Sequence, residues 1–265
     1  MEGVSALPRI SILTATAIEF RAIGRALPKP RRVWSRGRSC LLSTQLSNAV
    51  LLMRTGMGPQ KSRTVTQELL GEGKWDLVIS TGFAGALRDL PIGTLVVGED
   101  VLEDPFAIPH KHPIACDAAW LAKLSRFSGQ SAPFSIARFA TVPSVLTRSE
   151  EKQKLANLTG AMAVDMESGP IGGVAKEFGI PFIIIRTISD GMSEDLPLDF
   201  NLFETSGGWV KGLWQCLSSP RIWAGLFRLY RQSRKAALRL TQFFKGFLAR
   251  MLAPPTPTAI VGSVS

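Results

Sequence analysis

The segment PFIIIRTISD, residues 181–190, limits the possible folds of this chain more than any other stretch. Residues 182–185 are all large and apolar, so a strand built from them has no polar face. Such strands are typical of the centre of a sheet whose two faces are both covered. The segment therefore favours an α/β fold, in which helices alternate with strands along the chain.

The rest of the first 200 residues shows this alternation. We expect strands at 10–16, 49–56, 76–82, 92–101, 134–142, 161–166 and 181–190, and helices at 17–27, 60–71, 117–127, 149–157 and 168–179. The alternation stops after Leu198. A chain of 265 residues is long enough for one large α/β domain, or for such a domain with an appendage.

Polar or glycine-rich residues follow five of the expected strands. They are residues 14–16 with Glu19 close behind, 55–58, 81–85, 165–167 and 189–190. In sheets of this class ligands bind beyond the carboxyl ends of the strands. The five strand ends therefore predict one shared crevice.

Four motifs at these places match a known family. They are ISILTATAIEF, RTGMG, STGFAGAL followed by IGTLVVGEDV, and AVDMES followed by RTISD. Together they resemble the nucleoside phosphorylase/nucleosidase superfamily over residues 9–195, including the 23-residue spacing from Glu167 to Asp190. The resemblance implies a three-layer α/β/α phosphorylase/hydrolase-like fold with a central mixed β-sheet. It also implies a homo-oligomeric enzyme that cleaves N-glycosidic bonds without a cofactor, with phosphate as a possible co-substrate.

The resemblance assigns a role to each of four residues. Asp190 would share or donate a proton at N7 of a purine, a type of general acid catalysis worth about 10²–10⁴ in rate. Glu167 would accept hydrogen bonds from the ribose hydroxyls and stabilise positive charge as it develops on the sugar. Met166 would form an apolar floor under the ribose, and Glu19 would position or deprotonate the attacking water.

Each of these residues also has a purely structural interpretation. Glu167 could cap the helix that follows it, because an acid in a first turn interacts favourably with the helix dipole. Asp190 could be an N-cap after its strand, and Glu19 could be a solvated helix residue. Asp165 is interpreted as structural, and Arg186 as a partner for a carboxylate.

Further candidates follow from position alone. The purine pocket is expected to include the segment before AVDMES, around residues 142–146. The candidates for the purine are Val145, Leu146 and Ser189, and those for the nucleophile or an anion are Thr55, Gly56, Gly58 and Gly82. Arg54 could assist, because the backbone N–H groups of the glycine turn can form an anion-binding concavity.

The sequence departs from the phosphorolytic members of the family. Hexameric bacterial purine nucleoside phosphorylases place an arginine and a serine for phosphate where this chain has Ser80 and Phe83. This departure and the presence of Glu19 favour water over phosphate as the nucleophile.

The net charge of +10 belongs to the C-terminal part of the chain. From residue 205 onward there are nine bases and no acids, which leaves 22 bases and 21 acids in residues 1–204. A nearly neutral body argues against nucleic-acid binding. We expect a nucleoside phosphorylase-like catalytic domain at 1–204, a basic amphipathic helical extension at 205–252 and a disordered tail at 253–265.

The extension has two interpretations. It could be a helix packed on the domain with a solvated basic face, or an interfacial helix on an anionic membrane, where each base contributes about 1 kcal/mol. Its pattern SSPRIWAGLFRLYRQSRKAALRL resembles the hopanoid-biosynthesis-associated phosphorylase branch of the superfamily. That resemblance implies release of adenine from adenosylhopane, a lipid-linked 5′-substituted adenosine.

The remaining sequence features concern localisation, metal binding and alternative functions. We find no signal peptide and no membrane span, and the three separate cysteines have no ligand spacing, so we expect a cytoplasmic protein that could bind peripherally to the inner face of the membrane. His110 and His112 are interpreted as part of a surface loop rather than as metal ligands. The alternatives to adenosylhopane cleavage are a methylthioadenosine/S-adenosylhomocysteine nucleosidase, a generic purine nucleoside phosphorylase and a non-catalytic membrane-associated purine-binding module.

Overall fold

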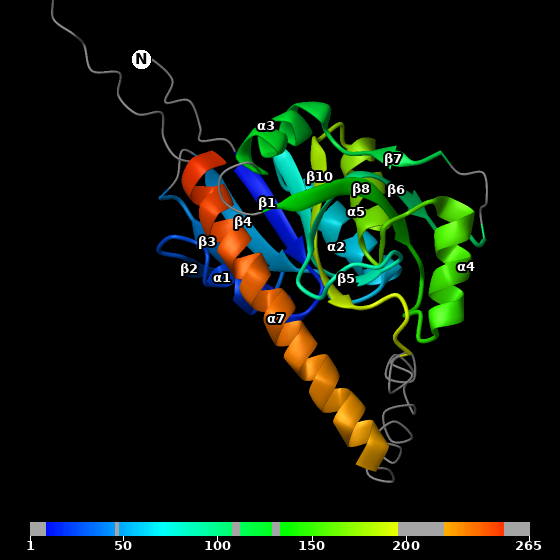
Figure 1. The fold of residues 1–265 in the computed structure, drawn as a ribbon. Helices are drawn as coiled ribbons and strands as arrows, with labels where there is room; N and C mark the ends of the chain where they lie inside the picture. Colours follow the sequence, from blue (N-terminus) through cyan, green and yellow to red (C-terminus); the bar gives the residue numbers. More distant parts are fainter. Residues whose placement is uncertain (1–8, 46–47, 108–111, 129–132, 196–219, 252–265) are drawn as a thin grey trace, which may run out of the picture.

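The computed structural model describes residues 9–45, 48–107, 112–128, 133–195 and 220–251 (Figure 1). Its strands are β1 Arg9–Thr14, β2 Arg31–Ser35, β3 Arg38–Ser43, β4 Ala49–Arg54, β5 Leu77–Ala86, β6 Leu95–Glu103, β7 Ile114–Ala115, β8 Phe134–Thr141, β9 Ala163–Asp165 and β10 Phe182–Asp190. Its helices are α1 Ala17–Gly24, α2 Pro59–Leu70, α3 Ala118–Ser128, α4 Ser149–Thr159, α5 Ser168–Glu177 and α7 Pro220–Met251.

The strands form one mixed sheet, as predicted. The pairs β1–β4, β1–β5, β5–β10, β6–β8 and β8–β9 are parallel, and β10–β6, β5–β9 and the pairs of β2 with β3 and β3 with β4 are antiparallel. Strand β10 pairs with both β5 and β6, so β5, β10, β6, β8 and β9 form a closed ring of pairings. The most apolar segment of the chain therefore has a paired strand on each side, as its composition indicates.

Helices cover both faces of the sheet, which gives the predicted three layers (Figure 1). On one face, α2 and α5 contribute Leu69 and Val174 to a core with β5 and β10. On the other face, Ile23 of α1, Leu124 of α3 and Phe244 of α7 pack in a second core. The α/β class and the layer arrangement predicted from the sequence are confirmed.

One local element was not predicted and one local prediction was wrong. The β2–β3 hairpin was not expected, because its sequence RRVWSRGRSC mixes bases with apolar residues and lacks a clear alternating pattern. Strand β5 does not turn at residue 82 but continues to Ala86. Its glycine-rich end stays extended because Gly85 pairs with Asp190 of β10 and with Val164 of β9.

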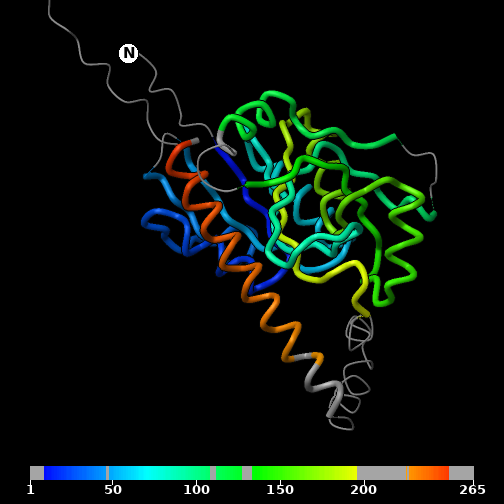
Figure 2. The backbone as a smooth tube through the Cα atoms, viewed as in Figure 1, coloured from blue at the N-terminus to red at the C-terminus, as the bar shows by residue number. Residues whose placement is uncertain are grey.

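Helix α7 packs along the domain over its C-terminal half (Figure 2). The fully buried side chains on this half are Ala236, Leu240, Phe243, Phe244, Phe247 and Leu248. The Thr241 hydroxyl donates a hydrogen bond to the carbonyl of Ala22 in α1 at 2.9 Å. For residues 236–248 the structure thus agrees with the packed-helix interpretation of the extension.

The N-terminal half of α7 is different, because Phe227 and Tyr230 are 62% and 56% exposed. Residues 205–219 of the expected extension and the expected disordered tail, 253–265, lie outside the described residues. Within the described part of the chain, no helix is both long and apolar enough to span a bilayer.

Candidate active site

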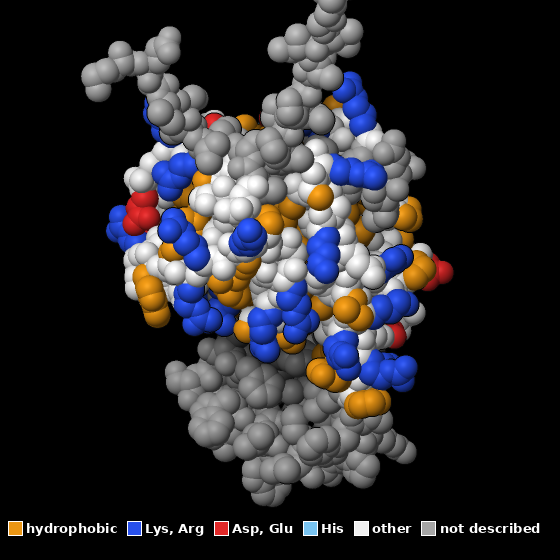
Figure 3. All heavy atoms as spheres, turned by 90° about the vertical axis from the view of Figure 1, so that its left-hand side faces the viewer, with side chains coloured by type: hydrophobic (Ala, Val, Ile, Leu, Met, Phe, Trp, Pro, Cys, Tyr) orange, Lys and Arg blue, Asp and Glu red, His pale blue; other side chains and the backbone are white. Residues whose placement is uncertain are grey.

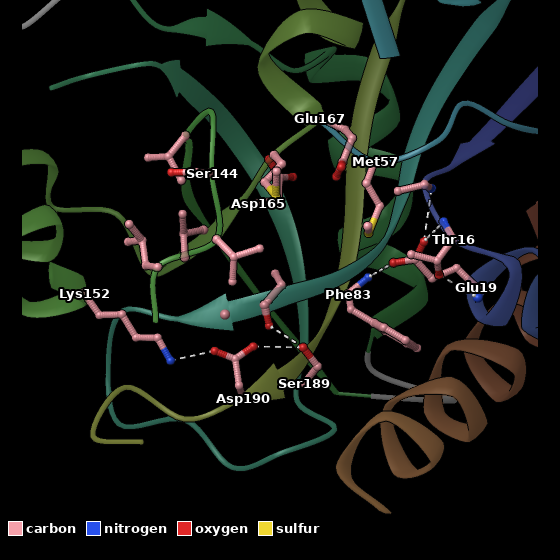
Figure 4. Close-up of a pocket in the computed structure, with 18 residues that line it drawn as sticks. Thr16, Glu19, Met57, Phe83, Ser144, Lys152, Asp165, Glu167, Ser189 and Asp190 are labelled. Atoms are coloured by element: carbon pink, nitrogen blue, oxygen red, sulfur yellow. Dashed lines mark hydrogen bonds and ion pairs between the residues drawn. The ribbon is translucent and has the colours of Figure 1, made fainter. Parts of the chain in front are cut away.

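A cavity of about 230 Å³ lies beyond the carboxyl ends of β1, β5, β9 and β10. Figure 4 shows Glu19, Glu167 and Asp190 around it, each from a different strand end. Three of the five strand ends that the sequence singles out for a shared crevice thus contribute a carboxylate to one cavity.

Glu19 lies in the first turn of α1, and its carboxylate is held by three backbone N–H groups. Its Oε2 accepts hydrogen bonds from the N–H groups of Thr16 at 2.7 Å and Ala15 at 3.1 Å, and its Oε1 accepts one from Phe83 at 2.8 Å. Thr16 completes a capping box by accepting a hydrogen bond from the Glu19 N–H. Glu19 is 2% exposed, so the interpretation as a solvated helix residue is wrong.

Gly82 makes the position of Glu19 possible. Its φ is +148°, and a Cβ added there would clash with the Glu19 carboxylate and come within 3.0 Å of Arg186 Nη1. Gly82 does not line the cavity. Gly82 was predicted to lie beside the nucleophile or an anion, but in the structure its role is to leave space for the Glu19 carboxylate.

Glu167 lies between a backbone donor and a guanidinium. Its Oε1 accepts a hydrogen bond from the Gly58 N–H at 3.0 Å, and its Oε2 is 3.6 Å from Arg186 Nη2. Burial raises the pKa of Glu167 to about 7, although Arg186 lowers it. Glu167 is the N-cap residue of α5, but its side chain makes no capping hydrogen bond, so helix capping does not explain it.

Arg186 acts as the structural cation predicted from the sequence. It is 2% exposed, and its Nε lies 3.0 Å from Asp165 Oδ2. Asp165 Oδ1 accepts hydrogen bonds from the Thr141 hydroxyl at 2.6 Å and the Ser168 N–H at 3.2 Å. Buried charges of this kind persist only when paired, and the pair fixes the end of β9 just before Glu167.

Asp190 lies at the opposite end of the cavity from Glu19 (Figure 4). Its Oδ1 accepts a hydrogen bond from the Ser189 hydroxyl at 3.0 Å, and its Oδ2 accepts one from Lys152 Nζ at 2.6 Å. The Asp190 side chain is thus held by Ser189 and Lys152 rather than capping a helix, and no described helix begins immediately after it.

Lys152 was missed by the sequence analysis. It is 1% exposed, and its ammonium also donates to the carbonyls of Gly191 at 2.8 Å and Glu194 at 3.3 Å. Lys152 shares one face of α4 with Leu155, Ala156 and Thr159, all buried. That spacing of three and four residues was the available signal for a buried lysine.

The remaining predicted residues fall in two groups. Met166, Val145, Leu146 and Ser189 line the cavity, together with Met57 and Phe83. Thr55, Gly56 and Gly58 do not line it. Thr55 and Gly56 border a neighbouring cavity, and the Gly58 N–H is already bonded to Glu167.

The described residues contain no cluster of three or more His, Cys, Asp or Glu side chains that could hold a metal ion. His110, one of the two histidines considered at the sequence level, lies outside the described residues. Cys40 and Cys116 are free and buried, and burial raises the pKa of the Cys116 thiol to about 12.

The geometry agrees with comparisons to known proteins. Residues 9–209 match the model of the phosphorylase superfamily. A 5′-methylthioadenosine/S-adenosylhomocysteine nucleosidase of Shewanella halifaxensis is 25% identical over 216 residues, covering 76% of this chain and 94% of the relative. The chain therefore belongs to the phosphorylase superfamily, and the predicted class, an enzyme that cleaves N-glycosidic bonds, is confirmed.

Solved structures show the same fold. The futalosine hydrolase of Helicobacter pylori superposes with a TM-score of 0.71 at 20% identity, covering 91% of this chain and 97% of that one. A putative 5′-methylthioadenosine/S-adenosylhomocysteine nucleosidase of Borrelia burgdorferi, bound to adenine, superposes with a TM-score of 0.72 at 18% identity, covering 92% and 100%.

Proposed function

We propose that the protein hydrolyses the N-glycosidic bond of a 5′-modified adenosine and releases adenine. One observation carries this proposal. Three carboxylates from separate strand ends, Glu19, Glu167 and Asp190, line the same cavity at different places around it. A protein that only bound purines would not need an acid at each of these places.

The cavity suggests how the substrate lies. The base would sit between Asp190 and the apolar side chains of Val145 and Leu146, with N7 facing the Asp190 carboxyl. The ribose would lie on Met166, with its hydroxyls donating to Glu167. This arrangement directs the 5′ carbon away from Asp190, towards Thr16 and Met57.

The reaction would then proceed by assisted departure of adenine. A water near Glu19 attacks C1′ and gives a proton to the Glu19 carboxylate. The C1′–N9 bond breaks and its electron pair moves into the purine. Asp190, which takes up a proton from solvent when the substrate binds, passes that proton to N7 and returns to the carboxylate form. The Glu167 carboxylate stabilises the positive charge that develops on the sugar.

Water is favoured over phosphate by the side chains around Glu19. Lys152 is the only base among the described residues that line this cavity, and it is paired with Asp190 at the other end. The Ser80 hydroxyl, at a position used for phosphate in phosphorolytic relatives, is buried and accepts a hydrogen bond from Arg186 at 3.0 Å. Among the described residues that line this cavity, none is a base beside Glu19, and this supports water as the nucleophile.

The size of the 5′ substituent is a separate question. Similarity to methylthioadenosine/S-adenosylhomocysteine nucleosidases supports small 5′-thioadenosines as first substrates. A lipid-linked adenosine such as adenosylhopane is a second candidate. It is favoured by the exposed side chains of Phe227, Tyr230 and Leu238 on the basic helix α7, which could contact an anionic membrane.

The test is adenine release from methylthioadenosine, S-adenosylhomocysteine and a lipid-linked adenosine, each with and without phosphate. We expect release from at least one of them that does not depend on phosphate. Release of adenine only in the presence of phosphate would show that the reaction is phosphorolysis and not hydrolysis. No release from any of these substrates by folded protein would refute the proposal. Cosedimentation with anionic vesicles would support the membrane contact of α7, and its absence would refute that contact.

A further inference from the structure

A second cavity of about 720 Å³ lies beside the active site, between α1, the β2–β3 hairpin and the end of β4. Its lining contains five bases and, among the described residues, no acid. The bases are Arg21, Arg32, Arg38, Arg54 and Lys61. Figure 3 shows the face that carries α1, α7 and the hairpin, where Lys and Arg side chains far outnumber acidic ones. We call this hollow the basic cavity.

Most of these bases have no acidic partner. Arg38 Nη2 is 3.4 Å from Glu68 Oε2, a partly exposed pair that leaves the Arg38 Nε buried without a hydrogen bond. Within the described residues, Arg32, Arg54 and Lys61 have no acid within 4.0 Å. Uncompensated bases around a hollow concentrate positive potential there, which attracts anions.

The backbone adds to this potential. Lys61 lies in the first turn of α2, a helix of 12 residues with no acid in its first turn. The N-terminus of a helix carries a partial positive charge. Gly56, which also lines the basic cavity, has a φ of +87° and lies on the turn that leads into this helix.

The basic cavity borders the active site on the side where the 5′ carbon would point. Ala15 lines both cavities. Its neighbour Thr16 lines the active site, and Ala17 lines the basic cavity. In the same way, Met57 belongs to the active site and Gly56 to the basic cavity. A 5′ substituent leaving between Thr16 and Met57 would enter the positive potential of the second cavity.

We propose that the basic cavity binds an anionic group on the 5′ substituent of the nucleoside, so the preferred substrates are adenosines with an acidic 5′ extension. The inference rests on the proposed function and narrows its substrate class. Arg32, Arg54 and Lys61 supply the charge, and Met57, which is 46% exposed, contacts the apolar part of the extension. The anion stays outside the catalytic cavity, so the chemistry at C1′ is unchanged.

The test compares two substrates that differ only in charge, 5′-carboxyethylthio-adenosine and its primary amide. We expect the acid to be cleaved with the higher kcat/KM, mainly through a lower KM. The preference should weaken as ionic strength rises, because interactions between exposed charges are screened by salt. Equal kcat/KM values for the two substrates would overturn the inference.

Charge-neutralising variants locate the effect. Arg54→Gln and Arg32→Ser should each lower the acid-to-amide ratio of kcat/KM by about 2–5-fold, as expected for one exposed charge pair. Arg31→Ser is the matched control. Arg31 is an exposed neighbour on β2 that does not line the basic cavity, and side chains alternate between the two faces of a strand. The control should leave the ratio unchanged, and an equal change in all three variants would refute a local site.

Two competitors separate the possible sources of the anion. Inorganic phosphate and anionic phosphatidylglycerol vesicles are each added to the assay with the acid and with the amide. Weak competition by phosphate against the acid alone agrees with the proposal. Stronger inhibition by vesicles than by phosphate, equal for both substrates, would overturn it in favour of a lipid headgroup site. If neither substrate releases adenine, the proposed function itself is refuted. If both release adenine with equal kcat/KM, only the inference about the basic cavity is refuted.

Discussion

Replacing Lys152 by methionine should destabilise the protein and slow adenine release. Lys152 Nζ lies 2.6 Å from Asp190 Oδ2 and also donates to two backbone carbonyls, while its side chain is 1% exposed. At this distance and an effective dielectric constant of about 20, the Coulomb attraction is about 6 kcal/mol before the desolvation cost. Removal of one partner from a buried pair costs about 3–5 kcal/mol. We expect the lower end, because the Asp190 side chain keeps 14% exposure.

A double-mutant cycle separates stability from catalysis. Lys152→Met and Asp190→Asn should each lower the free energy of unfolding, since each leaves one charge without its counter-charge. The double variant carries neither charge. Its loss in the free energy of unfolding should therefore be smaller than the sum of the two single losses by about 2 kcal/mol or more. Its adenine release should nevertheless stay about 10²–10⁴-fold below that of the unchanged protein, because the proposed general acid is absent.

The measurements are urea unfolding, with constant m values as the check for two-state behaviour, and adenine release at saturating and low substrate. Additive losses in the free energy of unfolding would refute the pairing argument. Full activity of Lys152→Met would show that the ammonium does not position Asp190 for catalysis.

Two further predictions concern the core and pH. Phe244→Ala should lower the free energy of unfolding by about 3–5 kcal/mol because Phe244 is fully buried, whereas Phe227→Ala on the exposed part of the same helix should change it by less than about 0.5 kcal/mol; equal effects in urea unfolding would refute packing of α7. Because the pKa of Glu167 is raised from 4.5 to about 7, kcat/KM should rise with pH through about 7 as the carboxylate forms. The folded state holds this proton more tightly than the unfolded state, so the contribution of Glu167 to stability should fall as pH rises from about 4.5 to about 7. Glu167→Gln should remove both dependences, and an unchanged pH profile of kcat/KM in this variant would contradict the assignment.

The fold was largely predictable because local and global signals agree. Residues 182–185 of β10 are all apolar, and β1, β4, β8 and β9 are each followed by a helix of 8–12 residues. The hairpin of β2 and β3 was not predictable because only two of its residues, Cys40 and Ser43, are buried, and only one of them is apolar, so hydrophobic burial imposes little pattern on it. Its order depends on the antiparallel pairing of β3 with β4, the next strand along the chain.

The residues of the candidate site could be predicted from the sequence, but the hydrogen bonds that hold them could not. The motifs bring Glu19, Glu167 and Asp190 to one cavity because their strand ends meet at one edge of the sheet. They do not show what holds each acid. The three N–H donors to Glu19 include the Phe83 N–H, 64 residues away, and this contact exists only once β1 and β5 are paired.

Helix α7 shows a further limit of the sequence analysis. Its composition suggested a separate basic extension, but the Gln232 side chain donates to both oxygens of Glu194 at 3.0 Å. The Glu194 carboxylate in turn accepts a hydrogen bond from the Gly191 N–H at 3.2 Å, and its carbonyl accepts one from Lys152. The helix is thus connected through Glu194 to the groups that hold Asp190. Since its apolar side chains also complete the core beside β10, removal of α7 would disturb the sheet and the Asp190 end of the cavity together.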